Sequence, residues 1–245
     1  ETYRATKAHV FGNCRAAVIA RDAPIAELPE CELWTFGADA AYGRREAGLH
    51  PNGQLLLGGE AVLRADQLKV VGSHNHLNVL AALAAGCAAG FDLTSMVEAA
   101  LNFPGLPHRT EWVADIDGVG FFNDSKATNP GATLAAVRGF AGHPLRLLMG
   151  GQGKGADFEA LGRELASADV QVYVFGEDAA ELQRALGQDV VRVATMLEAL
   201  DAAHRSAEPG DVVLLSPACA SFDEFSGFAE RGERFARTVR EAADG

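Results

Sequence analysis

The sequence has no long hydrophobic run and few cysteines. No stretch approaches the ~18 consecutive apolar residues of a membrane-spanning helix, so we expect no membrane insertion. The four cysteines and seven histidines are scattered along the chain. They form no CxxC pair and no zinc-ligand spacing, so we predict no metal site built from Cys or His. The pattern indicates free thiols in a cytoplasmic protein.

Positive charge is also scarce, because 21 Lys and Arg stand against 33 Asp and Glu, a formal net charge of −12. A negative field of this size repels nucleic acid and anionic lipid, so neither is expected as a partner. An acidic small molecule remains compatible with the charge, since a local cluster of cations is enough to hold it.

The first residues, ETYRATK, contain neither an initiator methionine nor the apolar region of a signal peptide. We therefore expect the chain to be part of a longer cytoplasmic protein. Its 245 residues are enough for one large domain or two modest ones with hydrophobic cores.

The first hundred residues predict a small set of strands followed by two helices. One helix begins near Asn75, where leucines and alanines recur at helical spacing. A second helix runs from Leu93 to Asn102 and ends before Pro104. The predicted strands are Ala16 to Ala20, Glu32 to Phe36, Gln54 to Leu57 and Leu68 to Val71.

The segment FPGLPHR, Phe103 to Arg109, is rich in Pro and Gly and is the expected hinge between two domains. The predicted domains are residues 1–105 and 106–245.

After the hinge, strands alternate regularly with helices. This pattern predicts an α/β domain with a parallel sheet covered on both faces. The predicted strands are Gly118 to Phe122, Leu145 to Met149, Val170 to Phe175, Val190 to Val193 and Asp211 to Leu215. The predicted helices are Gly131 to Phe140, Phe158 to Ala166, Ala179 to Leu186, Met196 to Arg205 and Phe222 to Ala242.

Three polar segments follow predicted parallel strands. They are NDSKATN at 123–129, GGQGKGADF at 150–158 and SPACASFDEF at 216–225. One such loop alone is an ordinary source of turns and helix caps. Three of them at one rim, two carrying a lysine, favour a ligand site, because ligands of open α/β sheets bind beyond the carboxyl ends of the strands.

The segment GGQGK is not a phosphate-binding P-loop. The pattern G-x-x-x-x-G-K-[ST] requires Gly at 148 and Ser or Thr at 155, where this chain has Leu148 and Gly155. The dinucleotide pattern G-x-G-x-x-G is absent as well. Lys154 is a candidate point charge for a carboxylate or phosphate, and a solvated surface lysine is an equally open interpretation.

Two further segments, the hinge and the start of the helix near Asn75, carry candidate binding residues. Arg109 at the hinge either reaches a ligand or is a surface charge. Asn75 and Asn78 lie three apart on one helical face, where two amides suit a purine edge or a ribose. The structural alternative is that Asn75 caps its helix.

The segments LPHR at 106–109, NDSKATN, GGQGK and SPACASFDEF occur in the order seen in the Mur ligases, and the chain resembles that family. More narrowly, it resembles the members that add glutamate. The resemblance implies that residues 1–105 are the latter part of an α/β central ATPase domain of the P-loop type. Residues 106–245 are then the C-terminal Rossmann-like domain that binds glutamate. The P-loop itself lies outside this chain, so the chain alone is expected to be inactive.

The activity implied by the resemblance is that of a cytoplasmic ATP-dependent acid–amino-acid ligase. It adds D-glutamate to UDP-N-acetylmuramoyl-L-alanine through an acyl phosphate, in peptidoglycan synthesis, and so serves cell shape and division. ATP and Mg²⁺ are the implied cofactors, and a monomer is expected. The alternatives are a ligase that adds L-glutamate, a folylpolyglutamate-type ligase, or a non-catalytic module that binds an acidic metabolite.

The resemblance also implies roles for individual residues. Lys7, as a carbamate, is expected to hold Mg²⁺, and it is grouped with Lys126 and Arg109 as catalytic. The residues implied to contact ATP are Asn75, Asn78, Arg109, Asp124 and Lys126. The residues implied to contact glutamate are Thr128, Lys154, Ser221 and Phe228.

Overall fold

The computed structural model describes residues 6, 9–23, 30–187 and 189–245. The chain divides into two compact units, Glu1–Pro104 and Gly105–Gly245. The division falls within the Pro/Gly segment and one residue before the domain boundary expected from the sequence. Lys7 lies outside the described residues.

Unit 1 contains a five-stranded mixed sheet with the order β1-β2-β3-β4-β5. The first three strands pair in parallel, and β3, β4 and β5 pair antiparallel. The strands are β1 (Ala16–Ala20), β2 (Glu32–Gly37), β3 (Glu46–Leu49), β4 (Gln54–Leu57) and β5 (Glu60–Arg64). Strands β3 and β5 were not predicted from the sequence.

The strand predicted at Leu68 to Val71 is wrong. The short helix η2 (Ala65–Gln67) precedes it, and Gly72 caps the next helix directly after it. Leu68 packs against the core of unit 1 without pairing in the sheet. An irregular segment can also bury apolar side chains, so the apolar residues of this segment suggested a strand where none forms.

The helices α2 (Ser73–Ala89) and α3 (Leu93–Asn102) complete unit 1. Helix α2 packs on strands β1 to β4, and its Leu80, Leu83 and Ala84 enter the core with Leu55 and other residues of the sheet. A small residue is needed where the two helices meet, because a Cβ on Gly86 would lie 2.0 Å from Sδ of Met96.

Unit 2 contains a six-stranded sheet with the order β10-β9-β8-β11-β7-β6. Five strands are parallel and the edge strand β6 is antiparallel to β7. The strands are β6 (Glu111–Ile116), β7 (Val119–Asn123), β8 (Leu145–Gly150), β9 (Val170–Phe175), β10 (Val191–Arg192) and β11 (Val212–Leu215). The parallel sheet was predicted, whereas β6 was not.

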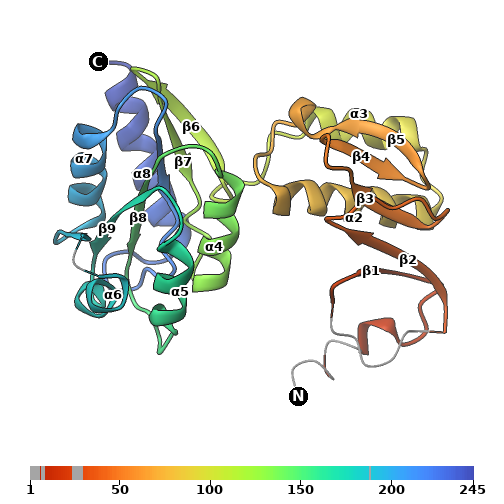
Figure 1. The fold of residues 1–245 in the computed structure, drawn as a ribbon, viewed down its shortest axis with the longest axis horizontal. Coiled ribbons are helices and arrows are strands. Elements are labelled where there is room, and N and C mark those ends of the chain that lie inside the picture. Colours follow the sequence, from red (N-terminus) through yellow and green to blue (C-terminus); the bar gives the residue numbers. More distant parts are fainter. Residues whose placement is uncertain (1–5, 7–8, 24–29, 188) are drawn as a thin grey trace. The chain divides into compact units, whose positions relative to one another are not determined.

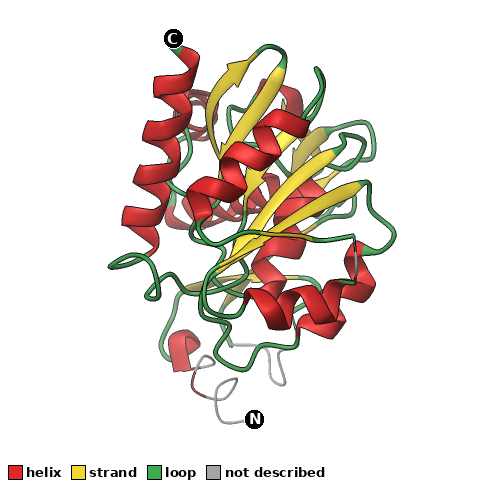
Figure 2. Cartoon of the chain, turned by 90° about the vertical axis from the view of Figure 1, so that its left-hand side faces the viewer, coloured by secondary structure: helices red, strands yellow, loops and turns green. Residues whose placement is uncertain are grey.

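Helices cover both faces of this sheet (Figures 1 and 2), as the continuously apolar strands require. Helices α7 and α8 share a buried cluster with one face, and α4, α5 and α6 lie on the other. The helices are α4 (Pro130–Gly139), α5 (Phe158–Leu165), α6 (Ala179–Leu186), α7 (Met196–Ser206) and α8 (Phe228–Ala243).

Helix α8 begins six residues later than the predicted start at Phe222. Gly227 caps it in an extended conformation, and Phe222 belongs to the preceding loop, where it is 62% exposed. The apolar residues of FDEFSGF therefore suggested a longer helix than the chain forms.

The strand order creates a switch point between β8 and β11. The chain leaves β8 toward β9 on one side, and it leaves β11 toward α8, which packs over β6 and β7 on the other. Loops that diverge from neighbouring strands open a crevice at the carboxyl edge of an α/β sheet, where ligands bind. The segments GGQGK and SPACASFDEF are the two diverging loops.

Two glycines at the end of β8 allow close backbone approaches, Gly150 to β9 and Gly151 to the loop after β11. A Cβ on Gly150 would lie 2.1 Å from the carbonyl oxygen of Phe175, and one on Gly151 would lie 2.0 Å from that of Ala220. Both glycines have positive φ, 155° and 119°. Any side chain at these positions forces the backbone apart.

Among the helices of the described residues, none combines the length and apolarity that crossing a membrane requires.

The substitution Gly151→Ala is expected to lower the free energy of unfolding of unit 2 by roughly 3 kcal/mol, through the clash with Ala220 and the backbone conformation. Gly155→Ala is the matched control in the same loop, since it also has positive φ but a Cβ there meets nothing within 4 Å. We expect it to cost about 1 kcal/mol. Urea unfolding followed by circular dichroism measures both, and equal losses would contradict the steric argument.

Candidate active site

The three polar loops predicted from the sequence meet at one rim of unit 2. The loop after β7 holds residues 123–129, the loop after β8 holds residues 151–157, and the loop after β11 holds residues 216–227. Backbone hydrogen bonds join the last two. Gly150 donates to Pro217 at 3.0 Å, and Gln152 and Ala220 exchange two hydrogen bonds of 2.9 Å.

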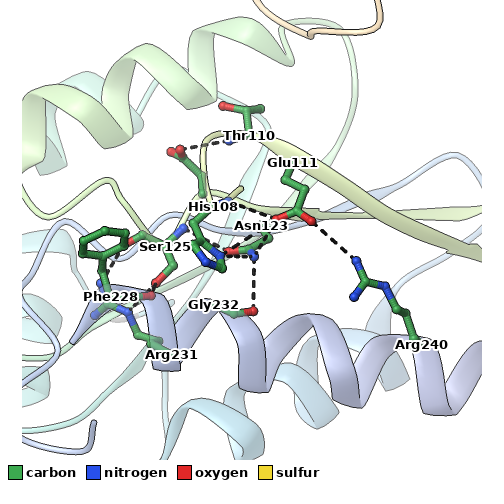
Figure 3. A network of polar contacts seen from close by, with 10 residues as sticks. His108, Thr110, Glu111, Asn123, Ser125, Phe228, Arg231, Gly232 and Arg240 are labelled. Carbon is green, nitrogen blue, oxygen red and sulfur yellow. Dashed lines mark hydrogen bonds and ion pairs between the residues drawn. The ribbon is translucent and has the colours of Figure 1, made fainter. Parts of the chain in front are cut away.

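A buried arginine that the sequence analysis did not single out connects all three loops. Arg231, on the first turn of α8, has 0% exposure. Its guanidinium donates to Ser125 through both the hydroxyl (3.0 Å) and the carbonyl oxygen (2.9 Å), to Cys219 O at 3.1 Å and to Gly150 O at 3.3 Å. Figure 3 shows Arg231 directed toward Ser125 beneath Phe228. One side chain therefore fixes the relative positions of the three strand ends.

The charge of Arg231 is not neutralised by a hydrogen-bonded carboxylate. Each of its hydrogen bonds to the described residues goes to a carbonyl or hydroxyl oxygen. Burial lowers its pKa to about 10, while the negative groups around it, among them Asp223 and Glu224, act in the opposite direction. It therefore stays protonated at neutral pH and places a buried positive charge under the rim.

The sequence contained a weak signal for this residue. Arg231, Phe235 and Val239 follow at four-residue intervals and are all buried, so the arginine lies on the apolar stripe of α8. A charge on that stripe is unusual unless it has partners.

Asp124 is also used inside unit 2. It is 7% exposed, and its two carboxylate oxygens accept hydrogen bonds from Thr110 N at 3.1 Å and from the Ser216 hydroxyl at 2.9 Å. Burial raises its pKa to about 6, while these hydrogen bonds and the charge of Arg109 hold it lower than burial alone would. Asp124 thus links Thr110, which directly follows the hinge segment, to the loop after β11.

Lys126 and Phe228, predicted for different ligands, lie together. The Lys126 ammonium sits 3.9 Å from the centre of the Phe228 ring, a cation–π contact. The carbonyl oxygen of Phe228 accepts a hydrogen bond from the Ser125 hydroxyl at 2.8 Å. His108 packs edge-on against the same ring, with centroids 6.1 Å apart. These contacts place the start of α8 against the NDSKATN loop.

The predicted glutamate residues occupy the three joined loops. Thr128 is half-buried just before α4, and Ser221 is 2% exposed. Lys154 is exposed, with its ammonium 5.2 Å from the Phe222 ring centre. No hydrogen bond links the side chains of these three described residues. Lys154 has φ of 52°, and a strained backbone of this kind persists where its surroundings hold it, often at functional sites.

The start of α8 is open to an anion. No side chain caps α8, where the N-cap residue is Gly227; α2 and α6 lack a side-chain cap as well, and Glu230 is the acidic residue of the first turn of α8. The uncapped N–H groups and the helix dipole favour negative charge near Phe228, the first residue of the helix.

The remaining predicted residues have separate surroundings. In unit 1, Asn75 donates to Val71 O at 2.8 Å, and the exposed Asn78 amide donates to Asn75 Oδ1 at 3.5 Å, so these two predicted residues do lie together. The proposed helix cap at Asn75 is wrong, because Gly72 is the N-cap of α2. In unit 2, Arg109 is exposed between two residues with positive φ, His108 and Thr110.

Within the described residues, no group of three or more His, Cys, Asp or Glu side chains gathers as metal ligands do. The magnesium prediction rests on Lys7, of which the structure describes nothing, and we derive no step through a metal.

Comparison with known proteins identifies the family. Residues 108–219 match the model described as "Mur ligase, glutamate ligase domain". A UDP-N-acetylmuramoylalanine–D-glutamate ligase of Pseudomonas fluorescens is 41% identical over 258 residues, which is 98% of this chain and 56% of the relative. The Escherichia coli K12 protein of the same name is 40% identical over 98% of this chain and 56% of its own length. The chain thus spans just over half of these relatives.

Solved structures share the fold at lower identity. UDP-N-acetylmuramate-alanine ligase from Thermotoga maritima matches with a TM-score of 0.67 and 19% identity, over 98% of this chain and 55% of that one. A bifunctional folylpolyglutamate synthase/dihydrofolate synthase with Mn, AMPPNP and L-glutamate bound matches with a TM-score of 0.64 and 18% identity, over 97% and 57%. The family model and the relatives agree: residues 108–219 are a Mur ligase glutamate ligase domain, and nearly the whole chain is similar to UDP-N-acetylmuramoylalanine–D-glutamate ligases.

Proposed function

We propose that the chain is part of an ATP-dependent ligase that adds D-glutamate to UDP-N-acetylmuramoyl-L-alanine, and that the rim of unit 2 binds the glutamate. The observation that carries the proposal is the convergence of three polar loops on Arg231 at the switch point of the sheet. The names of relatives 40–41% identical over 98% of the chain supply the substrate class.

The two carboxylates of glutamate would be held by different parts of this rim. Lys154 and Thr128 are assigned to one carboxylate, and Ser221 with the backbone N–H of Phe228 to the other. Lys154 is exposed and free of an ion pair among the described residues, so it is available for a charge-assisted hydrogen bond. The open start of α8 and the buried charge of Arg231 add positive potential inside a protein of net charge −12.

Arg109, Asp124 and Lys126 of unit 2 are assigned to the nucleotide, and the nucleotide role of Asn75 and Asn78 stays a prediction from the sequence. Solved relatives of the same fold include a MurF ligase in complex with ADP and the synthase with AMPPNP. Asp124 already accepts hydrogen bonds from Thr110 and Ser216, but a carboxylate offers about four lone-pair sites, which leaves room for a ribose hydroxyl.

The reaction proposed is amide formation through an acyl phosphate. The carboxylate of UDP-N-acetylmuramoyl-L-alanine attacks the γ-phosphorus of ATP and ADP leaves. The amine of glutamate then attacks the acyl carbon, and phosphate leaves from the tetrahedral intermediate. Arg109 and Lys126 are assigned to the charge that develops on phosphoryl oxygens, and the rim holds the amine in position. Magnesium would shield the same phosphoryl oxygens when bound, with Lys7 as the predicted ligand.

A cytoplasmic location, a monomeric state, and roles in cell shape and division stay part of the proposal. So does the inactivity of this chain alone. The folylpolyglutamate alternative rests on fold similarity at 18% identity. The residue types at the rim suit either enantiomer of glutamate. Binding measurements with D-glutamate, L-glutamate and other acidic metabolites therefore distinguish the proposed ligase from an L-glutamate ligase and from a non-catalytic module.

We expect titration calorimetry of this chain to detect D-glutamate binding, and Lys154→Ala to weaken it by roughly tenfold or more, because one charge-assisted hydrogen bond is lost. The matched control is Lys69→Ala, which removes another exposed lysine, in unit 1. Tighter binding of L-glutamate would favour the alternative ligases, and binding of another acidic metabolite without glutamate would favour the module. Equal effects of the two lysine substitutions would remove Lys154 from the site.

Replacing Arg231 tests the connection between the loops. Arg231→Met removes four hydrogen bonds and leaves buried carbonyl oxygens of Ser125, Gly150 and Cys219 without this donor, so we expect unit 2 to lose about 3 to 5 kcal/mol of stability. Arg231→Lys keeps the charge but cannot reproduce the planar fork, so D-glutamate affinity should fall in this variant although the positive charge is retained. Arg237→Met, on the exposed side of α8, should change stability by less than about 0.5 kcal/mol. Unchanged glutamate affinity in a folded Arg231→Lys variant would contradict the positioning role.

The raised pKa of Asp124 predicts a pH dependence of stability. The folded protein holds the proton up to about pH 6, whereas an ordinary Asp releases it near 3.8. Stability from this group is therefore greatest below pH ~4 and falls as the pH rises toward 6, by on the order of 3 kcal/mol. Asp124→Asn should remove this part of the dependence. Urea unfolding of the wild-type protein and Asp124→Asn between pH 4 and 7 measures how the free energy of unfolding of each depends on pH. Equal pH dependence of the two proteins would contradict a raised pKa of Asp124.

A further inference from the structure

Two cysteines lie side by side where two neighbouring strands of unit 1 begin. Cys14 and Cys31 precede β1 and β2, which pair in parallel with Ala16 opposite Glu32. The backbone holds the two approaches together, since Glu32 N donates to Arg15 O at 3.0 Å. The Sγ atoms are 2.8 Å apart. The two thiols therefore meet through the strand pairing, although 17 positions separate them in the sequence.

This position suits covalent bonding of the two sulfurs. The two sulfurs need to approach by less than ~1 Å to reach an S–S bond of ~2.05 Å. Both residues are half-buried, so a small oxidant reaches them. The Cys14 sulfur raises the pKa of the Cys31 thiol to about 11, because Cys31 keeps its proton while it is hydrogen-bonded to Cys14. Because Cys31 is held in its protonated form, the first attack is assigned to Cys14.

The other two cysteines lack these features. Cys219 is 0% exposed, and burial raises its pKa to about 12. Cys87 is half-buried on α2, and burial raises its pKa as well. Among the four cysteines, all within the described residues, only Cys14 and Cys31 have sulfur atoms in contact. Cys87 and Cys219 therefore serve as internal controls for oxidation.

We propose that Cys14 and Cys31 form a reversible disulfide with hydrogen peroxide as the two-electron oxidant. The Cys14 thiolate attacks one peroxide oxygen, the O–O bond breaks, and with one proton taken up the products are a Cys14 sulfenic acid and water. The Cys31 sulfur then attacks the Cys14 sulfur, the S–O bond breaks, and the hydroxyl leaves as water with the proton of Cys31. Two thiols and one peroxide give one disulfide and two waters. A dithiol reductant then restores the two thiols by thiol–disulfide exchange.

The disulfide would restrain the chain segment between the two strands. It closes a loop of 17 residues, a length at which a cross-link appreciably restricts the unfolded chain. It also joins the beginnings of β1 and β2, the first two strands of the sheet on which α2 packs. The oxidised form of unit 1 should therefore unfold at a higher temperature than the reduced form. This inference does not depend on the function proposed for unit 2.

The test uses the whole chain, reduced and then treated with hydrogen peroxide near stoichiometric amounts. We expect the intact mass to fall by two hydrogen atoms, and peptide mapping after alkylation to find Cys14 linked to Cys31. A dithiol should restore the mass. The unfolding temperature of the oxidised protein should be several degrees higher than that of the reduced protein.

Matched variants separate this pair from general thiol oxidation. Cys14→Ser and Cys31→Ser should both abolish the loss of two hydrogens, and the shift in unfolding temperature should vanish with it. Cys87→Ser should keep both. A treated wild-type protein that retains four alkylatable thiols, or a cross-link that survives in Cys31→Ser, would overturn the proposal. Alkylation of the untreated variants, with Cys219 protected in the native state, confirms that each is folded.

Discussion

The buried guanidinium of Arg231 is the interaction on which the arrangement of unit 2 depends. Three loops leave the carboxyl ends of β7, β8 and β11, and each offers this arginine a carbonyl oxygen. Carbonyls at strand ends have no partner within the sheet, and burying them without a donor is costly. The arginine satisfies them and gains enough hydrogen bonds to remain charged in the interior. A planar side chain with five N–H donors suits this task, which a lysine cannot perform.

This arrangement changes how the segment NDSKATN is understood. Its polar residues suggested a loop directed at ligands, but the first three face inward. Asn123 and Ser125 are buried and hydrogen-bonded to α8, and Asn123 also contacts His108 of the hinge (Figure 3). Asp124 is buried as well and accepts hydrogen bonds from Thr110 and from Ser216 in the loop after β11. Lys126 and Thr128 are left partly exposed. The segment therefore combines a structural half with a half available for binding, and the structural half determines where the other is held.

The two units also differ in where chemistry is concentrated. Unit 2 gathers its polar groups at the switch point of the sheet, as strand order requires of an α/β fold. In unit 1 the distinctive contact is the thiol pair at the beginning of β1 and β2. Scattered cysteines had indicated unrelated free thiols, and the parallel pairing of two strands brought two of them together.

The sequence by itself determined the alternation of strands and helices, the Pro/Gly hinge and the positions of the polar loops. The extents of β1, β4, β9, α3 and α6 agree with the predictions residue for residue, because hydrophobic period and turn residues are local properties. Strands β3, β5 and β6 escaped notice, since their identity as strands comes from antiparallel neighbours. Only the tertiary structure decided which charged residue of α8 is buried, namely Arg231. It also decided that the Asp124 side chain faces inward and that Cys14 contacts Cys31. Burial and contact depend on what packs against a residue, and the partners here are up to 106 positions away in the chain.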